Sequence, residues 1–335
     1  MTKPIYVTFL NGPDIAALEL TDQEILDAIE TSLAAQGHGQ AVIEPRMHLK
    51  PNPEVDGHFN VLRGALGGDI GLAGVKVVSD FAFNYERGLP SEMAVLNLFD
   101  PATGMPRAIL DASGITDMRT GAMTAIGAKH LARKGSKILG HIGARGTAYW
   151  NVRLLDRLFD FDEIRVHSRR RESQQAFAAR LSADLGKPVR AMDDWQSTVE
   201  GADIVVEASR LLRPEPLLQT AWIKPGALVM PYGTMSAIEL SLTDIMDKLV
   251  VDDWGQATVG PFGSLRAHVA AGKLSPETLH AELGQIVAGL RPGRESDAET
   301  ILFWHRGLSL SDIALGYAML RKGERLGIGQ RLRFS

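Results

Sequence analysis

The stretch ILGHIGARGTAYWNVRLL (138–155) starts as an apolar run, passes through the short turn GARGT and ends in an amphipathic segment. Gly143 stands where a dinucleotide-binding turn carries its first glycine, and Ala148 stands where it carries its last small residue. Arg145 replaces the glycine that usually faces the phosphates. Because a helix that starts after such a turn attracts a pyrophosphate, we expect a nucleotide site here; a plain strand–turn–helix is the alternative. Its residues would be Gly143, Ala144, Arg145, Gly146 and Thr147.

The next apolar run ends in VHSRRR, where an NAD site usually carries an acidic residue for the ribose 2′-hydroxyl. This chain has Ser168, Arg169 and Arg170 instead. A hydroxyl beside guanidinium groups suits a 2′-phosphate, whereas a cluster of arginines at a helix start opposes the helix dipole. The pattern therefore predicts NADP more than NAD; a solvated basic helix start is the other interpretation.

Several isolated charged residues could take part in catalysis or binding, but each also has an ordinary structural explanation. Lys76 lies within GVKVV, where strand alternation makes a solvent-facing lysine the default. Arg46 and Arg119 can be surface cations, although an arginine in the first turn of a helix is unfavourable for the dipole. His305 in FWHRG has a side chain that can exchange protons near neutral pH, and it can equally be a buried, hydrogen-bonded histidine.

The composition excludes some classes of site. Of the 335 residues, 45% are hydrophobic and 23% are charged, so the chain can bury a large core, and its length favours two domains. The net charge of −4 gives no electrostatic reason to expect binding to nucleic acid or to a membrane. The absence of cysteine rules out disulfides, zinc–thiolate sites and thiol nucleophiles, and no metal site is expected. The N-terminal segment has no signal-peptide pattern, which predicts a cytoplasmic protein.

Two regions with different rhythm divide the chain. A first strand in PIYVTFLNG and a helix in LTDQEILDAIETSLAAQG precede a series of short β-like runs between residues 40 and 112, which predicts a mixed, mostly antiparallel sheet. Thr21 and Glu24 form a capping box for that helix, and a second helix follows from Ile115 with Thr116 as its expected N-cap.

From residue 137 onward, strands alternate with helices: KILGHI, EIRVHS, PVRAM, ADIVVEA, ALVMPYG and KLVVDD are the candidate strands, and ELSLTDIMD is one of the candidate helices. This alternation predicts a parallel sheet covered on both faces. The fold class is therefore α/β: a doubly wound Rossmann sheet inserted into a smaller α+β domain.

Motifs along most of the chain resemble the ornithine cyclodeaminase/mu-crystallin family. They include EPRMHL, AGVKVV, FNYERGLPSE, LFDPATGMPRAILDASGITDMRTGA, the glycine turn, SAIELS and FWHRGLSLSDIALG. The resemblance implies a substrate-binding and dimerisation domain made of 1–118 plus 311–335, and a Rossmann domain at 119–310. It also implies a nicotinamide cofactor and chemistry at the carbon–nitrogen bond of an amino acid or its imine.

Carried over to this sequence, the resemblance gives roles to single residues. Arg46 and Arg119 would grip the substrate carboxylate, with arginine suited to bidentate contact. Lys76 would give or take the proton at the reacting centre, and Asn84 would line the pocket or face the cofactor. Residues expected to contact the cofactor, besides the turn and the VHSRRR segment, are Arg119, Thr120, Tyr232 and Gly233.

Two departures from the family pattern bear on the activity. Cyclodeaminases carry an aspartate where this chain has Gly233, in VMPYGTMSAIELS, which disfavours a true ornithine cyclodeaminase. FWHRG places His305 and Arg306 where relatives have a small hydroxyl or a lysine; His305 becomes a second candidate for proton transfer, and Arg306 a second carboxylate contact.

We therefore expect an NAD(P)H-dependent imine reductase or amino acid dehydrogenase that acts on a small amino or imino acid and forms a homodimer through its first domain. A cyclodeaminase-like lyase that uses bound NAD and a non-enzymatic, mu-crystallin-like binding protein are the alternatives. The substrate, the physiological direction and the choice between Lys76 and His305 as main proton donor stay open.

Overall fold

The computed structural model describes residues 3–81, 83–144, 146–211, 213–260 and 263–335, so Arg145 lies outside the described residues. The chain divides into two compact units. The first, which we call the discontinuous unit, comprises residues 1–119 and 308–335; the second, the central unit, comprises residues 120–307. The predicted boundaries at 118/119 and 310/311 lie within three residues of this division. The mixed α/β class with a Rossmann-type parallel sheet agrees with the prediction.

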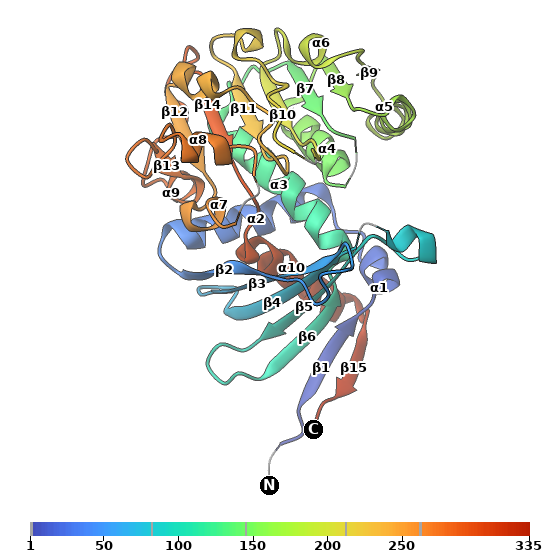
Figure 1. The fold of residues 1–335 in the computed structure, drawn as a ribbon. Helices are drawn as coiled ribbons and strands as arrows, with labels where there is room; N and C mark the ends of the chain where they lie inside the picture. The colour runs from blue at the N-terminus through green and yellow to red at the C-terminus, as the bar shows by residue number, and fades with distance from the viewer. Residues whose placement is uncertain (1–2, 82, 145, 212, 261–262) are drawn as a thin grey trace. The chain divides into compact units, whose positions relative to one another are not determined.

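The discontinuous unit is built on a seven-stranded sheet of order β15-β1-β6-β5-β4-β3-β2 (Figure 1). Within it β1 and β6 pair in parallel, and the other neighbours are antiparallel. Its strands are β1 (Tyr6–Leu10), β2 (Ala41–Leu49), β3 (His58–Leu66), β4 (Leu72–Asp80), β5 (Glu92–Phe99), β6 (Pro106–Asp111) and β15 (Gln330–Arg333). Its helical elements are α1 (Gly12–Ala17), α2 (Asp22–Gly37), η1 (Asn84–Arg87) and α10 (Ser309–Leu326), with the first turns of α3 (Ser113–Leu131).

Strand alternation gives this sheet two different faces. One row across it consists of Leu62, Lys76, Leu96 and Leu110, which are paired in register and buried. The next row, which points to the opposite face, consists of Met47, Val61, Val77, Val95 and Asp111. Met47 is 56% exposed and Val95 is 45% exposed, so this face carries an apolar stretch from β2 to β5 whose ends are exposed.

Helix α10 covers the buried face of the sheet and also packs on α2. Its approach is close: a Cβ on Gly74 of β4 would lie 2.5 Å from Ile313, and a Cβ on Gly316 of α10 would lie 2.5 Å from Leu96. Since such distances are far below van der Waals contact, only glycine fits at both points. This close packing brings the first turn of α10 to the row that contains Lys76.

The central unit is an eight-stranded parallel sheet of order β13-β12-β14-β11-β10-β7-β8-β9 (Figure 1). The strands are β7 (Ile138–Ile142), β8 (Glu163–His167), β9 (Val189–Ala191), β10 (Ile204–Glu207), β11 (Leu228–Pro231), β12 (Lys248–Val251), β13 (Ala281–Glu282) and β14 (Ile301–Trp304). The helical elements are the rest of α3, α4 (Ala148–Phe159), α5 (Arg171–Leu185), α6 (Trp195–Val199), α7 (Trp254–Ala257), α8 (Arg266–Ala270), α9 (Leu283–Val287), η2 (Thr220–Trp222) and η3 (Leu240–Ile245).

The order β9-β8-β7-β10-β11 reverses direction between β7 and β10, and ligands of doubly wound sheets bind where the order reverses, beyond the carboxyl ends of the strands. The glycine turn, which follows β7, lies at this point.

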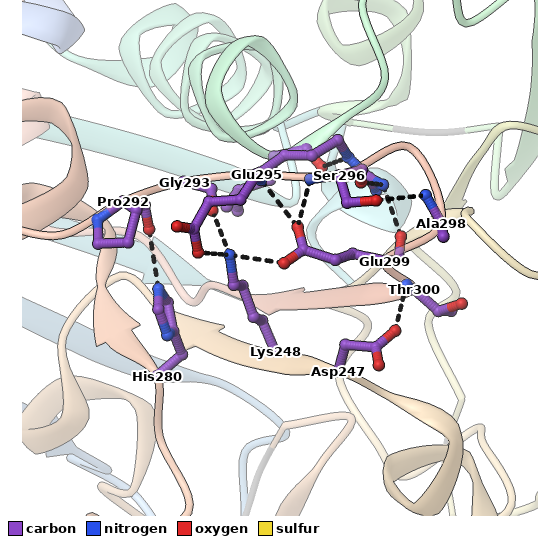
Figure 2. A network of polar contacts seen from close by, with 12 residues as sticks. Asp247, Lys248, His280, Pro292, Gly293, Glu295, Ser296, Ala298, Glu299 and Thr300 are labelled. Carbon is purple, nitrogen blue, oxygen red and sulfur yellow. Dashed lines mark hydrogen bonds and ion pairs between the residues drawn. The ribbon is translucent and has the colours of Figure 1, made fainter.

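A polar network near the β13 edge of the sheet, shown in Figure 2, has Lys248 of β12 at its centre. There Lys248 Nζ contacts Glu295 at 2.7 Å and Glu299 at 2.9 Å, and fixes the loop before β14. This network therefore has a structural role.

One expectation about the elements was wrong, because helix α3 begins at Ser113, so Thr116 lies inside it and is not its N-cap. The segment ELSLTDIMD is helical as expected, in the form of the short 3-10 helix η3. One element was missed: the C-terminal residues pair with β1 as an additional edge strand, β15, which the sequence pattern did not indicate. None of the helices in the described part of the chain combines the length and apolarity needed to cross a membrane.

Candidate functional site

The discontinuous unit contains a buried cluster of charge around Lys76. Lys76 is 1% exposed, although an exposed lysine was the default for its strand. Its Nζ lies 2.6 Å from Asp312 Oδ1 and donates a hydrogen bond of 3.0 Å to Thr116 Oγ1. Arg119 donates from Nε to the same Asp312 oxygen at 3.0 Å. We call Lys76, Thr116, Arg119 and Asp312 the Lys76 cluster; it joins one strand to two helices, α3 and α10.

Burial and neighbouring charges adjust the acidity of this cluster. Burial lowers the pKa of Lys76 to about 8; Asp312 acts to raise the pKa and Arg119 acts to lower it. Burial, with Glu92 as the next cause, raises the pKa of the nearby Asp117 to about 6. An amine with a pKa near neutrality can both hold and release a proton at physiological pH, as a general acid or base requires.

Arg46 and Asn84 are the other predicted substrate contacts in this unit. The pairing of β2 with β3 shifts register between Glu44 and Met47, which places Arg46 in a bulge opposite Leu62, the strand neighbour of Lys76. Bulges re-aim side chains, and this one is at the level of Lys76 in the sheet. Asn84 donates to the Pro90 carbonyl at 3.0 Å and so closes its own loop. A substrate contact by either residue stays a prediction.

In the central unit the glycine turn has the backbone that a pyrophosphate needs. Gly143 has φ of +112°, and a Cβ there would lie 2.7 Å from the Ala208 carbonyl oxygen. Gly146 also has a positive φ, of +54°. Thr147, the N-cap residue of helix α4, makes no capping hydrogen bond with its side chain, so its hydroxyl does not satisfy the first N–H groups of that helix. The described residues of the turn therefore fit a phosphate-bearing cofactor.

A chain of polar side chains supports this turn from within the central unit. The buried His141 contacts the Gly143 carbonyl through Nδ1 at 3.0 Å, and Asn151 Nδ2 lies 3.3 Å from His141 Nε2. Asn151 also donates to the Tyr232 hydroxyl, which lies 2.6 Å from Thr147 Oγ1. Burial lowers the pKa of His141 to about 4, so the ring is neutral and its Nε2 can accept the amide hydrogen.

The remaining predicted cofactor contacts have different environments. Thr120 is buried on α3, and its carbonyl accepts a hydrogen bond from Thr124. Arg169 and Arg170 are exposed after β8, while the Ser168 hydroxyl donates to the Arg170 carbonyl at 3.2 Å. Ala144 is half-buried. Contacts of these residues with a cofactor stay predictions.

His305 and Arg306 lie in the central unit, whereas the Lys76 cluster lies in the discontinuous one. The His305 ring is fully buried, stacks on Tyr232 with centroids 4.6 Å apart, and bonds Thr124 through Nε2 at 3.0 Å. Arg306 donates from Nη1 to the Val259 carbonyl at 2.6 Å. These contacts give both residues a structural role, and their part in catalysis or substrate binding stays a prediction.

Glu207, at the carboxyl end of β10, explains why position 233 is a glycine. Its buried carboxylate accepts hydrogen bonds from Ser209 N at 2.7 Å, Ser264 Oγ at 2.8 Å and Gly233 N at 3.3 Å. A Cβ on Gly233 would lie 2.5 Å from one carboxylate oxygen. The space that a side chain at 233 needs is thus filled by Glu207.

With this geometry established, comparison with known proteins assigns the chain. The sequence model of the ornithine cyclodeaminase/mu-crystallin family matches residues 8–321. The chain belongs to this family. An alanine dehydrogenase of Archaeoglobus fulgidus is 30% identical to it over 314 residues, which cover 93% of this chain and 94% of the relative.

Two similar solved structures agree with the fold. The Δ1-pyrroline-2-carboxylate reductase of Thermococcus litoralis, in complex with NADH and L-proline, has a TM-score of 0.89 at 27% identity and covers 97% of this chain and 100% of its own. An archaeal alanine dehydrogenase dimer with bound NAD also has a TM-score of 0.89 at 27% identity, covering 99% of this chain and 100% of its own. The named relatives are thus oxidoreductases of amino and imino acids, and their solved structures hold NAD or NADH.

The family resemblance led to Lys76 and Arg119, but two buried carboxylates were missed. Asp312 is one acid in a largely apolar segment, SLSDIALG, and Glu207 ends the apolar strand IVVE. An acidic residue at an otherwise apolar position is the sequence signal that could have led to both, since charged side chains are rarely buried without partners.

Proposed function

We propose that this protein is an NAD(P)H-dependent oxidoreductase that reduces the imine of an α-keto acid to an amino acid, or catalyses the reverse reaction. The observation that carries the proposal is the buried Lys76, with its ammonium on Asp312 and with Arg119 bound to the same carboxylate. The identity of the relatives supports the reaction class.

The chain's residues divide the work. Arg119 uses Nε for Asp312, so its terminal nitrogens are the groups that suit the substrate carboxylate, with Arg46 as a second cation. Lys76 gives a proton to the nitrogen as the imine carbon is reduced, and takes one back in the oxidative direction. A bound nicotinamide supplies or accepts the hydride. Gly143, Gly146 and the first turn of α4 would hold its pyrophosphate.

The test is a substrate panel. Pyruvate, glyoxylate and larger keto acids are each mixed with ammonia or methylamine, and cyclic imino acids such as Δ1-pyrroline-2-carboxylate are added directly. Loss of NAD(P)H absorbance measures reduction. The proposal predicts a clear preference for at least one imine over the same keto acid without amine; no oxidation of NAD(P)H with any imine would contradict it.

A cyclodeaminase-like lyase is the second candidate, and the geometry at Glu207 disfavours it. An aspartate at position 233 cannot be accommodated while the Glu207 carboxylate lies 2.5 Å from the Cβ position. The chain therefore has no room at position 233 for the aspartate that cyclodeaminases carry there. Incubation with ornithine and NAD should give no proline; proline formed as fast as the best imine is reduced would favour the lyase.

We also propose a preference for NADPH over NADH. Arg169 and Arg170 are exposed beside Ser168, at the start of the 15-residue helix α5, and supply cations for a 2′-phosphate. Replacing both by alanine should weaken NADPH binding at least about tenfold and leave NADH binding nearly unchanged. Arg171→Ala is the matched control, because Arg171 pairs with Asp193 at 3.2 Å. Equal affinities of the unmodified protein for the two cofactors would refute this preference.

Finally, we propose a homodimer through the uncovered face of the seven-stranded sheet. The row Met47, Val61, Val77 and Val95 is apolar from β2 to β5, and the next row carries Leu49, Phe59 and Met93 beside Ser79. An apolar face of this extent favours association, and an alanine dehydrogenase of the same fold is a dimer. Val95→Arg should shift the mass from dimer to monomer in light scattering. Leu290→Arg, which changes an exposed leucine of the central unit, should not. A monomeric unmodified protein would contradict the proposal.

A further inference from the structure

Asp312 is the acid on which both cations of the Lys76 cluster converge. We propose that Asp312 is a positioning residue that keeps the Lys76 ammonium protonated for proton transfer and fixes the Arg119 guanidinium for carboxylate binding. The inference rests on the proposed reductase function and adds to it a single residue that controls both steps.

The position of Asp312 follows from the close packing of α10. Asp312 lies one residue before Ile313, whose side chain occupies the space above Gly74. The first turn of α10 is therefore pressed against β4, two residues along that strand from Lys76. The side chain of Asp312 is 1% exposed and meets Lys76 Nζ at 2.6 Å, so water does not compete for this contact.

The contacts of Asp312 are unevenly shared between its two oxygens. Oδ1 holds both the Lys76 ammonium and the Arg119 Nε hydrogen. Oδ2 is buried and has no hydrogen-bond partner among the described residues. The carboxylate thus depends on these two cations for its compensation, and each cation is held in place by the same atom.

Other charged groups around Lys76 cannot replace Asp312. Arg119, from α3, repels the ammonium and lowers its pKa. Glu92, from β5, has a smaller effect on the pKa of Lys76 than Asp312 or Arg119, and Asp117, from α3, has a pKa raised to about 6 by burial and by Glu92. Asp312 is therefore the main group that opposes the effect of burial on Lys76.

Lys248 provides a comparison, because it is a buried lysine that contacts two carboxylates. It is also buried, at 7% exposure, and burial acts to lower its pKa, but Glu295 and Glu299 outweigh burial and raise it above the usual value (Figure 2). Among the described residues, Lys76 contacts one carboxylate, that of Asp312, which it shares with Arg119. With a pKa of about 8, Lys76 is protonated near neutral pH and can still give up its proton in the proposed reaction.

The test is Asp312→Asn in the full-length protein, with the titration of Lys76 as the readout. The protein is labelled with 13C-lysine, and the Lys76 Cε resonance is identified by its absence in Lys76→Arg. Loss of an opposite charge at this distance should lower the titration midpoint by roughly one pH unit or more. Lys248, in the same spectrum, should not change. Glu324→Gln, which removes an exposed acid from the far end of α10, is the matched control and should leave Lys76 unchanged.

Activity supplies a second readout. With the best imine, Asp312→Asn should raise KM about ten- to a hundredfold, because Arg119 loses a charge-assisted hydrogen bond that orients it. The alkaline limit of kcat should move to lower pH along with the Lys76 midpoint.

The outcomes separate this inference from the proposed function. An unchanged Lys76 midpoint in folded Asp312→Asn overturns the inference, whatever the enzyme reduces. A shifted midpoint in a protein that reduces no imine upholds the electrostatic role of Asp312 and overturns the reductase. If Asp312→Asn does not fold, Arg119→Gln replaces it: removing the competing cation should raise the Lys76 midpoint, and a lower or unchanged midpoint overturns the inference.

Discussion

Replacing Lys76 by methionine tests whether burial of this lysine lowers its pKa and thereby makes the stability of the protein depend on pH. Methionine is of similar length and has no charge, so the variant keeps the packing between the leucines of its row. The pKa of Lys76 is about 8 in the fold and 10.5 in the unfolded chain. Between these values the unfolded chain binds a proton that the folded chain does not.

The sign follows from that difference. When unfolding takes up protons, the free energy of unfolding rises with pH, so the wild-type protein should gain stability relative to Lys76→Met as pH rises through 8 toward 10.5. A difference of 10.5 − 8, or 2.5, corresponds to a gain of about 3 kcal/mol at about 1.36 kcal/mol for each pKa unit. At neutral pH, the difference in free energy of unfolding between the two proteins also contains the cost of leaving Asp312 with Arg119 as its remaining cation. The prediction therefore concerns how this difference changes with pH, and not its value at pH 7.

Urea unfolding at several pH values between 7 and 10.5 provides the measurement. All five tryptophans, at 150, 195, 222, 254 and 304, lie in the central unit, so circular dichroism must be followed beside tryptophan fluorescence to detect the discontinuous unit. Other titrating groups cancel in the difference between the two proteins. A difference that stays constant from pH 7 to 10.5, or in which the wild type loses stability relative to the variant, would refute the reasoning.

Two further predictions concern the central unit. His141→Gln should remove a pH-dependent loss of stability: the pKa of His141 is about 4 in the fold and 6.5 when unfolded, so the wild type should lose about 3 kcal/mol relative to the variant as pH falls from 6.5 to 4, and parallel stability curves would contradict this. Gly233→Ala should lower the unfolding temperature by several degrees because its Cβ meets the Glu207 carboxylate at 2.5 Å, and Glu207→Ala should recover part of that loss; an unchanged melting temperature in Gly233→Ala would show that Glu207 moves freely.

The sequence predicted those parts of the fold that depend on the pattern of apolar and polar residues within a short segment. Runs such as ADIVVEA and KLVVDD, separated by amphipathic segments, identified β10 and β12 of the parallel sheet because a strand buried on both faces is continuously apolar. The contact of β15 with β1 joins residues about 320 positions apart, and the sequence around either strand gives no sign of it.

The candidate site shows the same division. Lys76 and Arg119 were selected from a family motif, whereas their shared partner Asp312 depends on the docking of α10 against β4 and so on tertiary packing. Thr116 was expected to cap a helix and instead accepts a hydrogen bond from Lys76, because α3 starts one turn earlier. Local sequence chooses the residue types; which atoms meet is decided by the approach of elements distant in the chain.

The most direct test of the central claim is turnover of Lys76→Ala with the best imine found in the panel, measured together with its NADPH affinity. If Lys76 supplies the proton at the imine nitrogen, kcat should fall by about 10²–10⁴, the usual contribution of a positioned acid. The NADPH dissociation constant should stay within about twofold, because the glycine turn lies in the other unit. Unchanged turnover in a variant that still binds NADPH would remove Lys76 from the mechanism and leave His305 as the next candidate.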